Sequence, residues 1–234
     1  MQKSHVRFAC SILVLGCSSA LALAALAADD SGQEKVLVKL DETAAKFHTA
    51  EAKFTWTMFN SVINDVAETQ NGTIYFRRSA KDVQMAADID KPDAKQVIFS
   101  NGKIEVYQPN IATVDVYDAS AHREEFETFL VLGFGSSGQD MRKSFDITYG
   151  GDEKIDGVNT AKLELVPKSD KIKQHFPQII LWIDLQTGIS VQQKLVAPNG
   201  DYRLAEYSAI QLNQKIPNKV FKLRTSNNPK IVTH

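Results

Sequence analysis

The feature that most constrains the fold is a series of short segments in which apolar and polar residues alternate, separated by turn-forming residues. Phe54, Trp56 and Met58 alternate with polar residues, which is the pattern of a half-buried strand. The dipeptides Asn71-Gly72 and Asn101-Gly102 favour tight hairpin turns. Strands joined by short turns pair antiparallel, because a parallel pair needs a crossover of a dozen or more residues. The sequence therefore predicts an antiparallel sheet.

The other strand segments follow at short intervals along the chain. Their apolar residues alternate or form short runs rich in β-branched and aromatic residues, bounded by glycine, proline or asparagine. We expect these strands at residues 73–78, 83–89, 97–99, 104–107, 114–116, 145–149, 161–166, 179–184, 189–196 and 202–210, with a last short strand at Phe221 and Leu223.

One segment near the start of the chain has helical periodicity instead. Val36, Leu40, Ala44 and Phe47 recur at a spacing of three or four residues, and residues 31–34 have the spacing of a capping box. An amphipathic helix is therefore expected at residues 33–49.

The middle of the chain is also helical and is unusually aromatic. Apolar residues cluster within residues 120–134, where we expect a short helix or two helical turns, followed by a flexible glycine-rich stretch and a second short helix around residues 139–143. With about ten or eleven antiparallel strands, one long helix and this helical insertion, the sequence predicts an α+β fold whose curved sheet forms an incomplete β-barrel.

Residues 1–28 have the pattern of a secretory signal peptide. Lys3 and Arg7 precede an apolar run, which ends in the small residues Ala25, Ala27 and Ala28. We therefore expect export to the periplasm with cleavage near Ala27/Ala28, leaving residues 29–234 as one domain.

Two other readings of the N-terminus stay open. The apolar run nearly reaches the roughly 20 residues that a membrane-spanning helix needs, so it is also compatible with a single anchor. Residues 14–17 resemble the site at which bacterial lipoproteins are cleaved and acylated, with Cys17 as the lipidated residue. The alanine-rich end and the apolar residues after Cys17 favour the exported, soluble form.

Charge and motif content argue against most catalytic and nucleic-acid-binding functions. The formal net charge is −1, so no broad positive field would attract nucleic acid. Both cysteines, Cys10 and Cys17, lie in the N-terminal segment, which leaves residues 29–234 without a thiolate nucleophile or a disulfide. Residues 133–138 match G-x-G-x-x-G without a surrounding βαβ unit, and no nucleophile–base or metal-ligand spacing is present. No enzyme activity, cofactor or metal is expected.

The apolar side chains on the alternating strand faces are the candidates for a ligand cavity, because an incomplete barrel can leave its interior unfilled. The alternative for each of them is an ordinary core packed against the first helix. The aromatic insertion and the glycines that follow it favour a cavity with a movable apolar lid. The cavity candidates are Phe54, Trp56, Met58, Ile74, Phe76, Val83, Met85, Val97 and Phe99, and the lid candidates are Phe126, Phe129, Leu130 and Phe134.

Several short motifs follow one another in a characteristic order. Residues 72–78 combine a glycine, alternating apolar residues and two arginines, and residues 101–103 and 106–109 give a turn and a strand that ends in proline. Later come residues 163–168, with a proline and a lysine, and residues 183–188, with a strand end and a turn. In order and spacing these motifs resemble the periplasmic outer-membrane lipoprotein carrier family, LolA, over nearly all of residues 29–234.

The resemblance implies an incomplete barrel with a helical lid over an apolar cavity that receives the acyl chains of a lipoprotein. It also implies that Arg78 hydrogen-bonds the lid and holds it shut when the cavity is empty, although Ser79 stands where the family has proline. The partners implied are acylated lipoproteins or lipid, an inner-membrane lipoprotein-releasing transporter and an outer-membrane acceptor. The carrier is expected to act as a monomer.

Two functions of different kinds follow from this resemblance. The first is a periplasmic carrier that shuttles lipoproteins from the inner to the outer membrane. The second is a lipid- or lipoprotein-sensing module on the same scaffold. The sequence departs from the family at Ser79, where the family has proline, and at Met85, near a position where the family often has tryptophan. These departures leave open whether the protein is the housekeeping lipoprotein carrier or a paralogue for another lipid-bearing cargo.

Overall fold

The computed structural model describes the chain from residue 20 to residue 234, except residues 80–82, 124–126, 128–129 and 226–227. In that part of the chain the helices are α1 (Ala20–Lys46), α3 (Gly138–Ser144) and α4 (Asp170–His175). The strands are β1 (Thr49–Asn60), β2 (Asp65–Arg78), β3 (Val83–Lys91), β4 (Lys95–Ser100), β5 (Lys103–Gln108), β6 (Thr113–Asp118), β7 (Phe145–Ile155), β8 (Val158–Pro167), β9 (Gln178–Asp184), β10 (Ser190–Val196), β11 (Tyr202–Leu212) and β12 (Lys230–Thr233).

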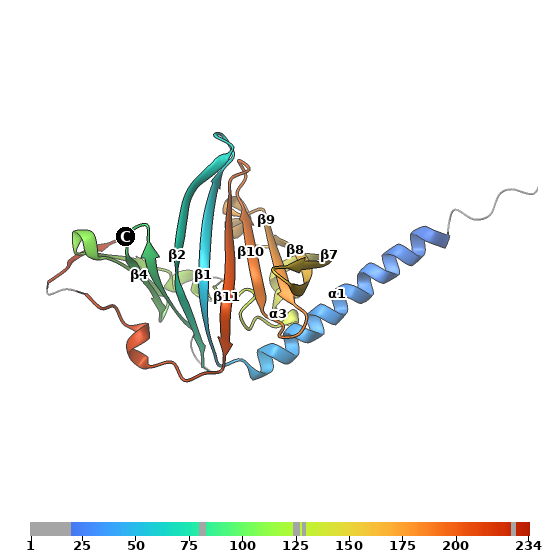
Figure 1. Ribbon diagram of the computed structural model, residues 1–234, viewed down its shortest axis with the longest axis horizontal. Helices are drawn as coiled ribbons and strands as arrows, with labels where there is room; N and C mark the ends of the chain where they lie inside the picture. Colours follow the sequence, from blue (N-terminus) through green and yellow to red (C-terminus); the bar gives the residue numbers. More distant parts are fainter. Residues whose placement is uncertain (1–19, 80–82, 124–126, 128–129, 226–227) are drawn as a thin grey trace, which may run out of the picture.

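The strands of the described chain form one sheet of twelve, in the order β12-β6-β5-β4-β3-β2-β1-β11-β10-β9-β8-β7. Neighbouring strands pair antiparallel except β12, which pairs parallel with β6. The order is linear, with β12 and β7 at its two edges, so the curved sheet does not close (Figure 1). This confirms the α+β class and the incomplete barrel, with twelve strands where about ten or eleven were expected.

The first helix differs from its prediction at both ends. It begins at Ala20 instead of residue 33, because the alanine-rich segment before Ser31 is itself a strong helix former. Ser31 therefore lies inside the helix and not at its N-cap. The helix ends at Lys46, three residues early, because the chain there joins the sheet: Asn213 Oδ1 accepts a hydrogen bond of 2.8 Å from the His48 N–H.

The two Asn-Gly dipeptides have different roles. Asn101-Gly102 forms the hairpin turn between β4 and β5, as expected, with φ of 53° and 72°. Asn71-Gly72 was predicted to be a turn, and this is wrong: it lies within β2, opposite Thr55 and Phe54. A glycine is needed at position 72 because a side chain there would collide with the backbone carbonyl of Asp88 on β3.

The end of the chain also departs from the prediction. Phe221 and Leu223 were expected in a last strand, but Phe221 ends a 3₁₀ helix, Asn218–Phe221, and Leu223 lies in irregular chain. Phe221 and Ile216 instead pack on Ala86 and Ile98, on the outer face of the sheet. The last strand is β12, which the sequence pattern did not indicate.

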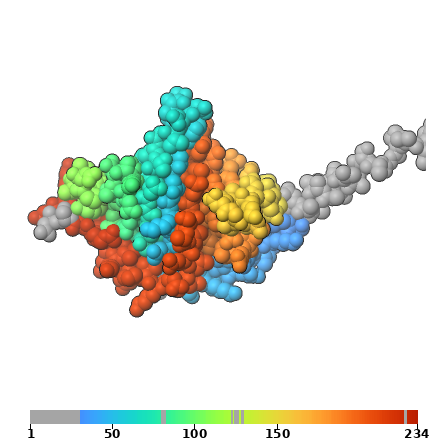
Figure 2. Space-filling model, in the orientation of Figure 1, coloured from blue at the N-terminus to red at the C-terminus, as the bar shows by residue number. Residues whose placement is uncertain are grey.

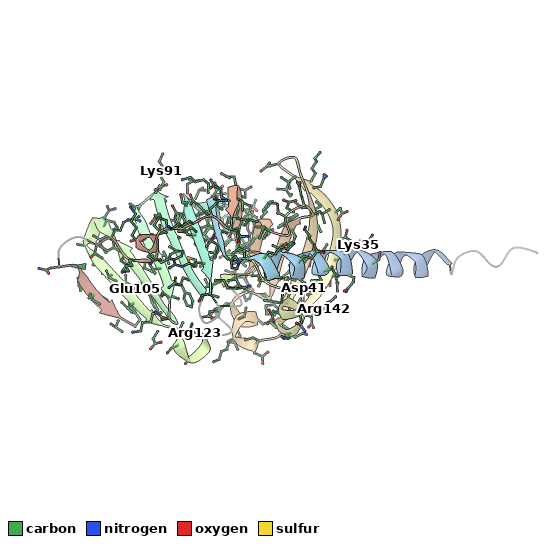
Figure 3. The ribbon with its side chains drawn as sticks, turned by 90° about the horizontal axis from the view of Figure 1, so that it is seen from below. Lys35, Asp41, Lys91, Glu105, Arg123 and Arg142 are labelled. Carbon is green, nitrogen blue, oxygen red and sulfur yellow. The ribbon has the colours of Figure 1, made fainter. Side chains whose placement is uncertain are left out.

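The inner face of the sheet carries the main apolar clusters. On one side α1 packs Val36, Leu37 and Leu40 against β7, β8 and β9. Figure 3 shows Asp41 of α1 close to Arg142 of α3. The two helices are joined there, because the Gln139 N–H donates to Asp41 Oδ1 at 3.2 Å and Arg142 pairs with Glu34. Helix α3 is therefore fixed to α1 and sets the position of the segment before it.

Candidate functional site

The predicted cavity residues gather on one face of neighbouring strands. Directly paired residues share a face of a sheet, and the pairs Ile74–Ala87, Ala87–Val97 and Met85–Phe99 carry that face from β2 through β3 to β4. In one cluster, Phe54, Ala87 and Ile89 are buried, and partly buried apolar side chains pack against them. Those partly buried residues are Trp56, Ile74, Met85, Val97 and Tyr207.

The remaining candidates lie at the margins of this cluster. Phe76 is buried in an adjacent cluster with Phe134. Val83 pairs with Arg78 near the ends of β3 and β2, and Phe99 is fully buried on β4. Met58 is half-buried near the other end of the sheet, where it pairs with Arg203. The structure thus places these candidates on one face of the sheet, and their role in lining a ligand cavity stays a prediction.

A buried segment at residues 131–136, here called the cover, lies against this inner face. Phe134 is at its centre and is fully buried. Its ring stacks on Phe76 with 4.7 Å between ring centroids and meets Tyr207 edge-on at 4.7 Å. Of the other lid candidates, Leu130 is half-buried, and Phe126 and Phe129 lie outside the described residues. A side chain of the insertion therefore occupies the inner face, as an apolar ligand would.

The cover is fastened through its backbone carbonyls. Arg78 Nη1 donates to Gly135 O at 2.5 Å, the Ser190 N–H donates to Gly133 O at 2.8 Å, and Gln193 Nε2 donates to Leu132 O. The donors come from β2 and β10, on either side of β1 and β11 in the sheet. The cover therefore bridges strands that are not neighbours, and opening it would break hydrogen bonds without breaking the sheet.

Arg78 is the charged member of this group of donors. Burial lowers the pKa of Arg78, while the carboxylates of Asp140 and Glu127 act to raise it. An arginine remains protonated across the physiological range, so its guanidinium is a charged donor to a neutral carbonyl. The guanidinium also lies 5.8 Å from the ring centroid of Phe47. The contact between Arg78 and the cover is thus the one that the resemblance implied; its role as a latch stays a prediction.

Two glycines shape the path of the cover. Gly133 and Gly135 have φ of 80° and 86°, which side-chain-bearing residues rarely adopt. A Cβ at Gly135 would lie 2.6 Å from the Phe47 ring, and one at Gly133 would lie 2.5 Å from Ser190 Cβ. The cover can approach Phe47 and β10 this closely only because these positions have no side chain.

Gln193 and Tyr207 are functional candidates that the sequence analysis missed. The Tyr207 hydroxyl donates to Gln193 Oε1 at 3.2 Å, so the amide that holds Leu132 O is itself held by the phenol. Burial raises the pKa of Tyr207. The pattern of β10 contains a signal for Gln193, because this polar residue occupies an inward position of the strand, in register with the apolar Leu181. A polar side chain at such a position needs a partner.

The described residues offer an apolar surface and hydrogen-bond donors, with no sign of a metal centre. Among them, no group of three or more His, Cys, Asp or Glu side chains is placed to hold a metal ion. No helix in the described part of the chain is long and apolar enough to cross a membrane.

Comparison with known proteins identifies the family. The family model described as "Outer membrane lipoprotein carrier protein LolA" matches residues 45–224. None of the curated proteins matches this chain in sequence. Among solved structures, an uncharacterized conserved protein from Thermus thermophilus is 9% identical, with a TM-score of 0.54 over 86% of this chain and 98% of that chain. MucB is 12% identical, with a TM-score of 0.53 over 86% of this chain and 66% of its own. These two likenesses are of fold alone.

Proposed function

The chain belongs to the LolA family of outer membrane lipoprotein carrier proteins, and from this premise we propose that it is a periplasmic carrier that binds the acyl chains of lipoproteins and shuttles them from the inner to the outer membrane. The family gives the chain a scaffold for binding lipoproteins or lipids. In this proposal residues 1–28 are removed on export, and residues 29–234 form the carrier domain.

The single observation that carries the proposal is the position of Phe134. Its ring lies between Phe76 and Tyr207 on the inner face, where a hydrocarbon chain would make the same apolar contacts. Each buried methylene is worth roughly 0.8 kcal/mol, so an acyl chain of about 16 carbons would gain on the order of 12 kcal/mol before losses. Displacement of the cover offsets part of that gain, which allows the cargo to be released.

The fastening of the cover has the strength that such an exchange needs. Each neutral hydrogen bond contributes about 1 kcal/mol net, and the bond from a charged donor contributes about 2 kcal/mol. The bonds to Leu132, Gly133 and Gly135 therefore hold the cover closed when the site is empty and yield to several acyl chains. Arg78 acts as the latch because its charged guanidinium can donate a hydrogen bond to a main-chain oxygen when the cover closes.

The partners in this proposal are those of a carrier. They are acylated lipoproteins as cargo, an inner-membrane lipoprotein-releasing transporter as donor and an outer-membrane acceptor. The monomer is the carrying unit.

The cargo-binding step is tested by diluting a purified triacylated lipoprotein out of detergent in the presence of the protein. A lipoprotein bound by the carrier stays in the supernatant after ultracentrifugation, whereas free lipoprotein sediments. Val97→Glu, which places a charge on the inner face, should abolish solubilisation, and Val166→Glu, on an exposed position of β8, should not. If the wild-type protein leaves the lipoprotein in the pellet, the carrier proposal fails. If it instead co-purifies with free lipid alone, a lipid-sensing module replaces it.

The latch is tested with the adjacent arginines of β2. Arg78→Leu removes the donor to Gly135 O, so the closed state no longer competes with cargo, and transfer of bound lipoprotein to acceptor membranes should slow by about tenfold. Arg77 is the matched control, because it donates to Gln84 and Asn218 and lies 4.2 Å from the Phe221 ring centroid on the outer face. Equal transfer rates for Arg78→Leu and Arg77→Leu would remove Arg78 from the mechanism.

A further inference from the structure

The hairpin between β1 and β2 carries exposed aliphatic side chains at its tip. Val62 is 86% exposed, Ile63 64% and Val66 49%, and Val62 is the most exposed large hydrophobic residue of the described chain. Figures 1 and 2 show this tip projecting beyond the neighbouring strands. Aliphatic residues scattered singly on a surface need no explanation, but three within five positions at a projecting end form a patch.

The N–H groups of residues 61–63 in the tip all have hydrogen-bond partners within the protein. Asn60 Oδ1 accepts hydrogen bonds from the Val62 N–H at 2.9 Å and the Ile63 N–H at 3.2 Å. Ser61 is tied to the β10–β11 hairpin, because its N–H and hydroxyl both donate to Asp201 Oδ1 at 2.8 Å. These donors need no water, so this part of the tip can leave water without losing hydrogen bonds.

An amphipathic collar lies directly below Val62 and Ile63, at the level of Val66, which pairs with Phe59 across the hairpin. Phe59 and Tyr202 stack with 4.7 Å between ring centroids, and Lys194 Nζ lies 4.0 Å from the Tyr202 ring centroid. Tyrosine and lysine beside buried apolar residues are the combination found at the boundary between lipid headgroups and acyl chains. The tip and the collar together reproduce the vertical order of a bilayer surface.

Composition and charge favour lipid over a protein partner. Anchors of protein–protein interfaces are enriched in Trp, Tyr and Arg, and valine is under-represented among them, whereas the large exposed hydrophobic residues of this tip are all aliphatic. Two carboxylates lie at the tip: Asp65 accepts from the Val66 N–H at 2.7 Å, and Asp201 accepts from Ser61 and Asn199. They outnumber the one cation of the collar, Lys194. A negatively charged tip would be repelled by anionic headgroups.

We propose that the β1–β2 tip is a membrane contact, in which Val62 and Ile63 enter the headgroup–acyl boundary of a zwitterionic bilayer, while Val66 and the Phe59–Tyr202–Lys194 collar rest at the headgroups. The contact is small and reversible, which suits a protein that must leave the surface again. It is independent of the carrier function, since the tip lies outside the cluster around Phe54 and the cover.

The test uses Val62→Trp with vesicles of phosphatidylcholine and phosphatidylethanolamine whose acyl chains carry bromine. Bromine quenches a tryptophan that enters the acyl region, so the added emission should be quenched. The matched control is Ile111→Trp, which replaces a 63% exposed isoleucine in the turn between β5 and β6 and should show no added quenching. In flotation, Ile63→Asp should lower the partition coefficient about tenfold and Ile111→Asp should leave it unchanged.

Three results would overturn the proposal. The first is unquenched emission from Val62→Trp with vesicles present. The second is binding that rises with phosphatidylglycerol content and disappears with salt, since this would indicate a basic surface elsewhere. The third is quenching that appears only with a protein partner in the vesicle. Far-ultraviolet circular dichroism shows whether each variant is folded, and lipoprotein solubilisation by Ile63→Asp separates this contact from the carrier function.

Discussion

Replacing Phe134 by alanine distinguishes a detachable cover from an ordinary core. The ring is fully buried against Phe76 and Tyr207, and a Phe→Ala change at such a site removes about 3–5 kcal/mol of favourable packing. Because the cover can leave without breaking the sheet, the lost packing energy reduces the free energy of closing the cover. Global stability can then fall by no more than the free energy of closing. A weakening of about 3 kcal/mol shifts the closing equilibrium by about 100-fold.

The assay compares binding with stability. An apolar ligand that has to displace the cover binds with its affinity reduced by the fraction of open molecules, so Phe134→Ala should bind a fluorescent fatty acid about 10- to 100-fold more tightly than wild type. Phe145→Ala is the matched control, because Phe145 is equally buried but packs in the cluster under α1. In urea unfolding it should lose about 3–5 kcal/mol while its fatty-acid affinity stays unchanged.

The outcome that refutes this reasoning is a specific one. If Phe134→Ala loses as much unfolding free energy as Phe145→Ala and its fatty-acid affinity does not rise, the ring of Phe134 is part of the permanent core. The inner face would then be filled by the protein itself, and the carrier proposal would lose its main support.

Three further predictions concern the cover and its surroundings. Gly135→Ala should speed hydrogen exchange of the cover amides about tenfold, because the new Cβ collides with Phe47 and the residue is also strained by its positive φ. The control is Gly157→Ala, which has the same strain at φ of 86° but open space around it. It should leave the exchange of the cover amides unchanged. Gln193→Leu should cost about 1–3 kcal/mol in urea unfolding, since it leaves the Tyr207 hydroxyl and Leu132 O without their partner, and a smaller loss than for Tyr207→Phe would contradict the network. Hydrogen bonding from Ser137 lowers the pKa of Asp140 from 3.8, so this carboxylate stabilises the fold above pH 3.8 and the stabilisation is lost as the pH falls below it. Asp140→Asn should therefore make the free energy of unfolding less dependent on pH in that range. An unchanged pH dependence would refute the assignment.

The strand pattern predicted most of the sheet because alternation reports directly which side chains face the core. The positions of Phe54, Trp56, Ile74 and Met85 follow from that rule, and they meet in one cluster. The rule does not say where a strand is interrupted. Asn71-Gly72 has the composition of a hairpin turn, but its glycine is required by the close approach of the Asp88 carbonyl, which depends on how the next strand, β3, pairs with β2.

The fastening of the cover was harder to predict for a physical reason. Two of its donors are side chains, Arg78 and Gln193, and the third is the backbone of Ser190, while all the acceptors are backbone oxygens. Backbone groups leave no trace in residue type, and Arg78 entered only through the resemblance. Short segments such as β12 are similarly hidden, because four residues provide too little periodicity to be recognised.

A fastening that holds main-chain oxygens is indifferent to most of the side chains it secures. The glycines at 133 and 135 are fixed by backbone shape, yet the residue that fills the inner face at 134 can be exchanged without altering a single donor–acceptor pair. The backbone atoms of the cover therefore determine how firmly it is held, and the side chain at position 134 determines how well it fills the inner face. Substitutions at position 134 alone could therefore adapt the inner face to shorter, longer or branched acyl tails while the hydrogen bonds of the cover stay the same.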